Sequence, residues 1–329
     1  MNKMIAYAVR PDELAAFEKF SKDLNIELTM VNENMSEENV HLAEGFEAVS
    51  ILGNCDASAK NIETLAQGGT KYLASRSAGF NNVDTEAIKA HGLRFSNATY
   101  SEDCVSDFTV LHVLMAVRQM KKIMKRGEMQ DFSLPGIQGK EMHNLTFGIV
   151  GTGRIGASTA RKLSGFGGKI IAQDVYENES LKDILTYVSL DELLTTADVI
   201  ILHAPLFDST YHMLNKETLA KTKEGVIIVN TSRGELIDTK ALIEALDSGH
   251  VSACGLDVVE GELGVFHVNH RNSNLTDHNL AYLRQHPNVV VSPHAAFYTN
   301  QAVSDMVEVA LTSLSGFMND NESKWEIKL

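Results

Sequence analysis

The chain has 329 residues, a hydrophobic content of 44% and a formal net charge of −14 at pH 7. This length is more than one hydrophobic core usually supports, so we expect two domains. The acidic balance leaves no basic stripe for phosphate backbones, which excludes nucleic-acid binding by counterion release. No apolar run approaches the ~20 residues of a membrane helix, so we expect no membrane partner.

The first hundred residues predict alternating strands and helices. Strands are expected at 4–9, 26–31, 48–52, 71–75 and 93–96, and helices at 12–24, 60–67 and 85–90. Such a series implies a parallel sheet covered on both faces. In the first helix, Leu14, Phe17 and Leu24 should point inward. Because the N-terminal residues are typical of a strand rather than a signal peptide, we expect a cytoplasmic protein.

One long helix is predicted at residues 101–125. Its apolar positions wrap widely around the axis, which indicates burial on more than one side and makes it a candidate domain connector and subunit contact. Further strands are expected at 147–150, 169–173, 199–202, 226–230, 253–258 and 289–292, with helices at 190–195, 217–223 and 239–246. Six strands complete a doubly wound nucleotide fold. Residues 264–285 are polar and irregular and predict a surface excursion.

After residue 298 the chain predicts one amphipathic helix. Its apolar residues keep three- and four-residue spacing from Val303 to Met318. The simplest topology returns this helix to the first domain, which makes that domain discontinuous. The three cysteines are widely spaced, with no zinc-ligand pattern, so we expect thiols in a reducing compartment and no metal site.

A dinucleotide-binding fingerprint lies near mid-chain, in the six residues Gly151, Thr152, Gly153, Arg154, Ile155 and Gly156. A β-rich run precedes it, and residues 154–166 can form a helix with Ile155, Thr159, Leu163 and Phe166 on one side. The three glycines serve the tight turn, the close approach of a pyrophosphate, and helix–strand packing. We therefore expect backbone amides and a helix N-terminus to bind a pyrophosphate here.

Asp174 ends the next predicted strand, 18 residues beyond Gly156. At about this spacing a carboxylate accepts hydrogen bonds from the adenosine ribose hydroxyls. Such a carboxylate repels a 2′-phosphate, and Val175 and Tyr176 offer no cation to hold one. The sequence therefore favours NAD over NADP.

Polar side chains follow the carboxyl ends of the later strands, where open α/β sheets bind ligands. Arg233 is planar, permanently charged and suited to bidentate binding of a carboxylate. His294 follows a strand and a proline and is suited to proton donation. Glu262 would orient His294 and stabilise its charged imidazolium. Together these three predict a hydride-transfer site.

The order Arg233, Glu262, His294 behind this fingerprint resembles the D-isomer-specific 2-hydroxyacid dehydrogenase family, and the resemblance covers essentially the whole chain. The stretches that carry it are residues 77–84, 97–101, 151–156, 203–206, 230–234, 257–262 and 292–299. The Phe297-Tyr298-Thr299 ending and the context of Tyr100 are most similar to the D-lactate and D-2-hydroxyisocaproate dehydrogenase branch.

The resemblance implies a fold of two doubly wound parallel-sheet α/β domains. Residues 1–101 plus 299–329 would form a flavodoxin-like substrate domain, and residues 102–298 a Rossmann NAD-binding domain. The relatives are dimers, with the nucleotide domain and the long helix at the contact, so a homodimer is expected. Closure of the two domains on the substrate would exclude water from the reaction.

The resemblance also implies a role for each site residue. Arg233 would clamp the 2-oxo acid, and His294 would donate a proton to its ketone oxygen while nicotinamide delivers hydride. Glu262 would orient His294. The resemblance implies substrate binding by Ala78, Gly79, Tyr100, Leu52, Phe297 and Tyr298. It implies cofactor binding by Asp174, His203, Ala204, Pro205, Asn230, Thr231 and Asp257 in addition to the glycine turn.

Two residues depart from the D-lactate pattern. Leu52 stands where lactate-specific relatives often have an aromatic residue, and Ala78 where the branch often has a larger aliphatic one. Both changes leave room beyond C3 and favour a branched or aromatic 2-oxo acid such as 2-oxoisocaproate or phenylpyruvate. One methylene discriminates by only ~1–3 kcal/mol, so D-lactate dehydrogenase activity on pyruvate remains the alternative.

Three other interpretations share this fold. Formate dehydrogenase is disfavoured because oxidation of formate needs no proton-donor pair. Here Glu262 would complete such a pair with His294. Longer phosphoglycerate dehydrogenases carry a C-terminal regulatory domain that has no counterpart here. An NAD-sensing transcriptional corepressor would bind peptides on its first domain and reduce 2-oxo acids only weakly. The acid–base pair favours the enzyme.

Overall fold

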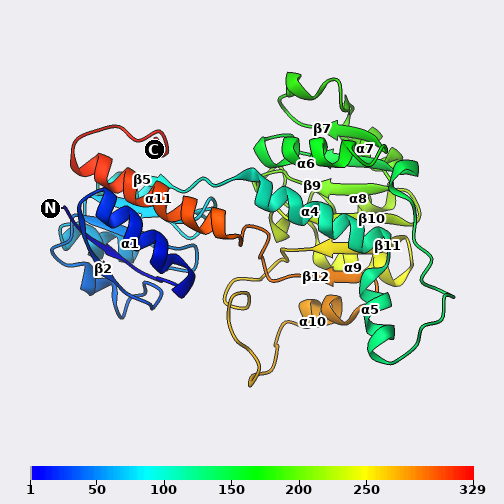
Figure 1. Ribbon diagram of the computed structural model, residues 1–329, viewed down its shortest axis with the longest axis horizontal. Coiled ribbons are helices and arrows are strands. Elements are labelled where there is room, and N and C mark those ends of the chain that lie inside the picture. The colour runs from blue at the N-terminus through cyan, green and yellow to red at the C-terminus, as the bar shows by residue number, and fades with distance from the viewer. Residues whose placement is uncertain (1) are drawn as a thin grey trace. The chain divides into compact units, whose positions relative to one another are not determined.

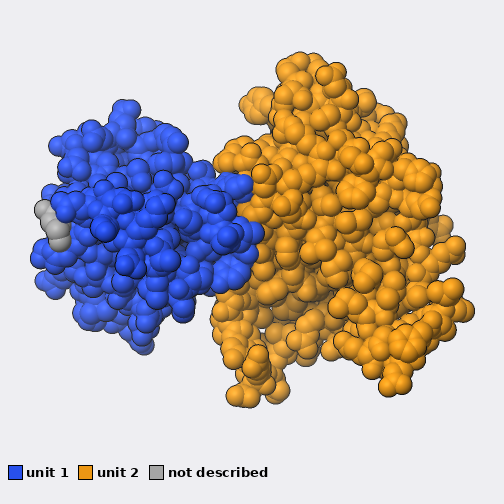
Figure 2. Space-filling view, in the orientation of Figure 1, with its two compact units in different colours: residues 1–101, 298–329 blue, residues 102–297 orange. Residues whose placement is uncertain are grey.

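The computed structural model describes residues 2–329, which divide into two compact units (Figures 1 and 2). Unit 1 comprises the described part of Met1–Ser101 together with Tyr298–Leu329, and unit 2 is Glu102–Phe297. The chain therefore leaves unit 1 and returns to it through its last helix. The predicted second junction, between residues 298 and 299, lies one residue later than the observed one.

Unit 1 is built on a five-stranded parallel sheet of order β2-β1-β3-β4-β5, the flavodoxin-like order. Its strands are β1 (Asn2–Ala6), β2 (Ile26–Met30), β3 (Ala48–Ile51), β4 (Tyr72–Ser75) and β5 (Arg94–Asn97). Its helices are α1 (Leu14–Asp23), α2 (Ala59–Gln67), α3 (Thr85–Ala90) and α11 (Asn300–Met318), with short 3-10 turns at Pro11–Glu13 and Val40–Ala43.

Two hydrophobic layers cover the sheet of unit 1. The α1 and α11 helices, far apart in sequence, lie side by side in Figure 1 and pack on one face through residues such as Phe17 and Leu311. The α2 and α3 helices cover the other face, with Ile62 and Ile88 fully buried. Leu14 was expected to point inward but is 47% exposed. It is the first residue of α1, and the buried face of this helix starts at Ala16.

Unit 2 contains a seven-stranded parallel sheet of order β12-β11-β10-β9-β6-β7-β8. Its strands are β6 (Thr146–Val150), β7 (Lys169–Gln173), β8 (Thr186–Tyr187), β9 (Val199–Leu202), β10 (Val226–Asn230), β11 (Val251–Leu256) and β12 (Val289–Val291). From β8 to β11 this is the doubly wound dinucleotide order, and β12 extends it. The prediction of six strands was wrong because β8 has two residues, too few for a pattern in sequence.

The helices of unit 2 also form two layers. They are α4 (Glu102–Val117), α5 (Met120–Glu128), α6 (Arg154–Ser164), α7 (Leu190–Thr196), α8 (Lys216–Ala220), α9 (Thr239–Asp247) and α10 (His278–Gln285), with 3-10 turns at Met142–Asn144, Glu179–Leu181 and Gly234–Leu236. The α4 and α6 helices share one core with the sheet, and α7 to α10 share the other.

Three predicted segments differ from the structure. The helix expected over 101–125 is broken at Gln119, whose φ of 53° is left-handed, so α4 and α5 are separate helices. The α6 helix ends at Ser164, which leaves Phe166 outside it and 38% exposed. The polar stretch 264–285 is not wholly irregular, because its last eight residues form α10 behind the N-cap Asp277.

A buried ion pair joins three strand ends of unit 1. Arg76 and Glu13 are both 0% exposed, and Arg76 Nε donates to Glu13 Oε1 over 2.9 Å. The guanidinium also donates to Ser50 Oγ at 2.9 Å and to the carbonyl oxygen of Tyr7 at 2.7 Å. The carboxyl ends of β1, β3 and β4 are therefore held by one side chain, immediately before residues 77–79.

We predict that Arg76→Met lowers the free energy of unfolding of unit 1 by about 3–5 kcal/mol, because the buried Glu13 loses its 2.9 Å partner and keeps only Arg10, whose Nε lies 3.9 Å away. The exposed pair Lys60–Glu37 offers a control, since Lys60→Met should cost less than about 1 kcal/mol. The measurement is urea denaturation followed by circular dichroism. Equal stability of the two variants would contradict the account.

Candidate active site

The turn between β6 and α6 leaves room for a dinucleotide. Gly151 has φ +92°, and a Cβ there would lie 2.7 Å from the carbonyl carbon of His203. A Cβ on Gly156 would lie 2.0 Å from the oxygen of Gly151, so these two positions require glycine. The N-cap Gly153 brings no side-chain acceptor to the helix start, and a Cβ there would meet no atom within 4 Å. Open space in front of a helix N-terminus fits a pyrophosphate.

Asp174 follows β7 beside this turn. Its Oδ2 accepts hydrogen bonds from the amide of Thr152 at 2.5 Å and from Thr152 Oγ1 at 3.0 Å, and its Oδ1 accepts from the amide of Tyr176 at 3.1 Å. Burial opposes the charge, but these donors outweigh it and hold the pKa of Asp174 below its usual value. A fixed anion with lone pairs to spare fits a ribose diol.

Neighbouring strand ends supply the other predicted cofactor residues. His203, after β9, faces Thr159 of α6 with 2.9 Å between Nε2 and Oγ1, and burial lowers the pKa of His203 to about 4. Ser232 Oγ donates to the oxygen of Ala204 at 2.7 Å, which joins the ends of β9 and β10. Thr231 is buried, and its Oγ1 lies 2.7 Å from Thr109 Oγ1 of α4.

Arg233 sits on a braced turn after β10. Asn230 Nδ2 donates to the oxygen of Arg233 at 2.7 Å, and a Cβ on Gly234 would lie 2.1 Å from the carbonyl carbon of Val259. The Arg233 guanidinium, half-buried, donates to the oxygen of Ser232 but has no carboxylate within ion-pair distance in residues 2–329. A fixed cation without an internal anion is suited to an anionic ligand.

Glu262 and His294 form a hydrogen-bonded pair. His294 Nδ1 lies 2.5 Å from Glu262 Oε1, and Glu262 Oε2 accepts from the amide of Val259 at 2.8 Å. The two side chains are 32% and 22% exposed, so a ligand can reach them. Since a carboxylate only accepts, His294 Nδ1 carries the proton, which leaves Nε2 for proton exchange with a ligand.

Two aromatic rings lie beside His294. The ring of Phe297 lies 6.5 Å from it, centroid to centroid, and the ring of His267 lies 6.2 Å from it. His267 Nε2 also lies 3.1 Å from the carbonyl oxygen of His294. This side of the imidazole is therefore lined by flat rings.

Five predicted substrate residues belong to unit 1: Leu52, Ala78, Gly79, Tyr100 and Tyr298. Leu52 follows β3, and its carbonyl oxygen accepts from Asn82 Nδ2 at 3.3 Å. The turn after β4 is held by Asn97 Nδ2, which donates to the oxygen of Ala78 at 2.7 Å.

That turn presents two backbone donors. Ser77 Oγ donates to the oxygen of Gly79 at 2.8 Å, whereas the amides of Ala78 and Gly79 donate to no acceptor among the described residues. Tyr298 begins the return to unit 1, is 52% exposed and lies against the guanidinium of Arg10. The strand ends of unit 1 thus carry the side chain of Leu52 and the amides of Ala78 and Gly79. The two amides are suited to binding an anion.

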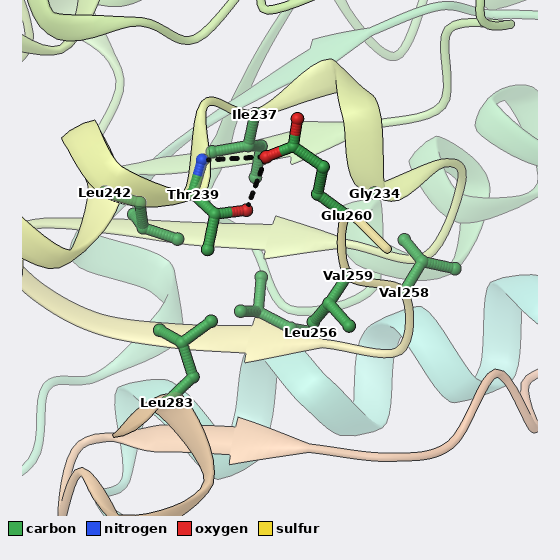
Figure 3. A pocket seen from close by; sticks show the side chains of 9 residues that line it. All are labelled: Gly234, Ile237, Thr239, Leu242, Leu256, Val258, Val259, Glu260 and Leu283. Carbon is green, nitrogen blue, oxygen red and sulfur yellow. Dashed lines mark hydrogen bonds between the residues drawn. The ribbon is translucent and has the colours of Figure 1, made fainter. Parts of the chain in front are cut away.

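Unit 2 also contains a small pocket beside the turn of Arg233 and the loop after β11 (Figure 3). Glu260 Oε2 accepts from Thr239 Oγ1 at 2.9 Å beside it. The pocket is lined by Gly234, Ile237, Thr239, Leu242, Leu256, Val258, Val259, Glu260 and Leu283. This set contains no member of the trio Arg233, Glu262 and His294, so we interpret the pocket as a packing gap under the loop after β11.

Sequence reasoning missed several residues that support the site. Tyr187 of the short β8 lies with its hydroxyl 2.9 Å from Thr152 Oγ1. Ser292 Oγ donates to Asp257 Oδ1 at 2.6 Å, and His112 of α4 reaches Ser292. Ser292 lay within a recognised stretch, whereas a lone histidine on an apolar helix gave no signal in sequence.

Among residues 2–329, no group of three or more histidine, cysteine, aspartate or glutamate side chains is arranged to hold a metal ion. No helix in this range is long and apolar enough to cross a membrane.

Known proteins are similar to this chain in sequence and in fold. Residues 109–296 match the model of the D-isomer specific 2-hydroxyacid dehydrogenase NAD binding domain. An aromatic 2-oxoacid reductase of Clostridium sporogenes is 45% identical, over 96% of each chain. A D-lactate dehydrogenase of Lactiplantibacillus plantarum is 38% identical, over 99% of each.

Solved structures agree with these sequence matches. The structure of a D-2-hydroxyisocaproate dehydrogenase superposes with a TM-score of 0.90 at 34% identity, over 99% of each chain. The predicted family, the two-sheet α/β fold and the NAD cofactor are confirmed. The chain belongs to the D-isomer-specific 2-hydroxyacid dehydrogenases and is an NAD-dependent oxidoreductase.

Proposed function

We propose that the protein reduces a 2-oxo acid with a branched or aromatic side chain to the (R)-2-hydroxy acid. The observation that carries the chemistry is the 2.5 Å contact between His294 Nδ1 and Glu262 Oε1. It fixes one proton on Nδ1, so that a second proton, bound at Nε2 in the imidazolium, is the one that can be transferred to a ligand. Bound NADH supplies the hydride for C2 of the substrate.

The side chains of unit 2 would perform the remaining steps. Arg233 has no carboxylate partner among residues 2–329, so it binds the substrate carboxylate and polarises the ketone through its second nitrogen. His294 Nε2 donates its proton to the ketone oxygen. Glu262 stabilises the imidazolium before transfer and holds the ring in place after it. Thr231 and Asp257 would bind on the nicotinamide side, with Asn230 bracing the Arg233 turn.

Substrate recognition is assigned to unit 1. The amides of Ala78 and Gly79 and the hydroxyl of Tyr100 hold the carboxylate. Leu52 and Ala78 leave space for the substrate side chain, where larger residues would fill it. The 45% identity with an aromatic 2-oxoacid reductase, against 38% with a D-lactate dehydrogenase, supports a bulky substrate.

We predict that His294→Gln lowers kcat by ~10²–10⁴, because glutamine cannot act as the acid. NADH binding, measured by fluorescence titration, should persist. His143 is exposed in the same unit, so His143→Gln serves as the control and should keep full activity. Arg233→Ala should damage substrate capture and polarisation of C2, and so should raise the KM for the 2-oxo acid and lower kcat. Full activity of the His294 variant would rule out its role.

We predict a kcat/KM for phenylpyruvate or 2-oxoisocaproate at least about tenfold above that for pyruvate, a difference of the size that pocket shape supplies. Absorbance of NADH with a panel of 2-oxo acids measures this. Leu52→Tyr should shift the preference toward pyruvate, and the exposed Leu42 offers the control Leu42→Tyr. A tenfold preference of the wild-type protein for pyruvate would assign it as a D-lactate dehydrogenase instead.

A homodimer is proposed on a separate observation. The α5 helix and the segment after it expose Met124, Met129, Phe132 and Leu134, at 55%, 72%, 81% and 78%. Several large apolar side chains exposed within one short segment are typical of a protein–protein interface. A second copy of the chain would cover them.

We predict that the double variant Phe132→Asp, Leu134→Asp is a monomer, whereas the wild-type protein is a dimer, because each buried aspartate would lose its hydration. Light scattering after size-exclusion chromatography measures this. Leu42→Asp, outside the segment, should remain dimeric. A wild-type monomer at micromolar concentration would contradict the proposal.

A further inference from the structure

His112 is a buried histidine with no place in the proposed reaction. It lies on α4, where the helix packs on β11 and β12, and is 1% exposed. Its ring fills the space beside Gly255, where a Cβ would lie 2.7 Å from His112 Nδ1. Burying an imidazole between a helix and a sheet is costly unless its nitrogens are used.

One nitrogen of His112 is used in a chain of hydrogen bonds. His112 Nε2 lies 2.9 Å from Ser292 Oγ, which follows β12. Ser292 Oγ lies 2.6 Å from Oδ1 of Asp257, which follows β11. All three side chains belong to unit 2, and His112 and Asp257 are fully or almost fully buried.

The donors in this chain follow from chemistry. The Asp257 carboxylate accepts the hydroxyl proton of Ser292, so the hydroxyl oxygen must accept from His112 Nε2–H. The imidazole is then neutral with its proton on Nε2. Consistent with this, His112 Nδ1 is buried and has no hydrogen-bond partner in residues 2–329. Burial lowers the pKa of His112, against the opposing effect of the Asp257 charge.

Asp257 in turn shapes the backbone around His294. Its Oδ1 accepts from the amide of Ala295 at 2.9 Å, and its Oδ2 accepts from the amide of Ala296 at 2.8 Å. Its carbonyl oxygen accepts from the amide of His294 at 2.7 Å. His294 itself has φ 50°, a left-handed conformation that costs a residue with a Cβ of order 1 kcal/mol or more. The Asp257 carboxylate offsets that cost only while both oxygens face these amides.

We propose that His112 is a positioning residue that holds Asp257, through Ser292, in the orientation that fixes the turn of His294. This inference rests on the proposed function, since it assigns His294 as the acid. His112, Ser292 and Asp257 act as a unit. If the His112 donor is lost, the Ser292 hydroxyl is free to rotate. The Asp257 carboxylate then loses one of its hydrogen-bond donors. A misplacement of the acid affects catalysis more than binding.

The kinetic test uses two substitutions at His112. His112→Leu removes the donor and should lower kcat about tenfold with phenylpyruvate, with the KM for NADH changed less than twofold. His112→Gln places an amide nitrogen where Nε2 stands and should restore kcat to within about threefold of wild type. Val113→Ala, a buried neighbour outside the hydrogen-bond chain, is the matched control and should keep kcat within twofold.

The second variant is Ser292→Ala, which should match His112→Leu. The double variant should be no slower than either single variant, because both break the same chain. Effects that multiply, or a His112→Leu enzyme as fast as wild type, would overturn the proposal. A Gln variant as slow as the Leu variant would assign His112 a purely structural role.

A measurement without turnover separates this inference from the proposed function. In ¹⁵N-histidine NMR of the protein, the signal that disappears in His112→Gln should show protonated Nε2 and unprotonated Nδ1 from pH 6 to 8. An imidazolium, or a proton on Nδ1, would refute the chain of donors. A wild-type protein that reduces no 2-oxo acid would instead refute the proposed function, whatever the NMR shows.

Discussion

The contact between His294 and Glu262 is the interaction on which the site depends. It is useful only because His294 is held in a left-handed backbone turn that directs its ring toward Glu262. That turn is stabilised by one carboxylate, Asp257, at the end of the adjacent strand. His294, whose backbone is strained, and Asp257, which stabilises it, thus lie at the ends of neighbouring strands. A doubly wound sheet binds its ligands at these strand ends.

In each unit, a buried polar side chain holds the backbone turn that carries the predicted site residues. In unit 1, Arg76 ties three strand ends together directly before the turn of Ala78 and Gly79. In unit 2, His112 and Ser292 support Asp257. Arg76 and His112 are fully or almost fully buried, so the core and not the solvent sets their geometry. The rigid part of the site is therefore in the backbone turns.

Much of this was predictable from the sequence, because glycine, strand-end and helix patterns have local causes. The fingerprint at Gly151, the strands and the α/β fold follow from such patterns. The two-residue β8, the break at Gln119 and the exposed Leu14 did not, since each depends on tertiary packing that overrides a local preference. The role of His112 could not be predicted either, because its partner Ser292 lies 180 residues away in the sequence.

The central claim is that His294 is the acid and Arg233 the anion clamp at one ketone. The most direct measurement is a crystal structure of the protein with NADH and a non-reacting 2-oxo acid analogue. The account predicts that His294 Nε2 lies within hydrogen-bonding distance of the ketone oxygen and that Arg233 contacts the carboxylate. An imidazole turned away from the ligand, or a carboxylate held by other residues alone, would contradict it.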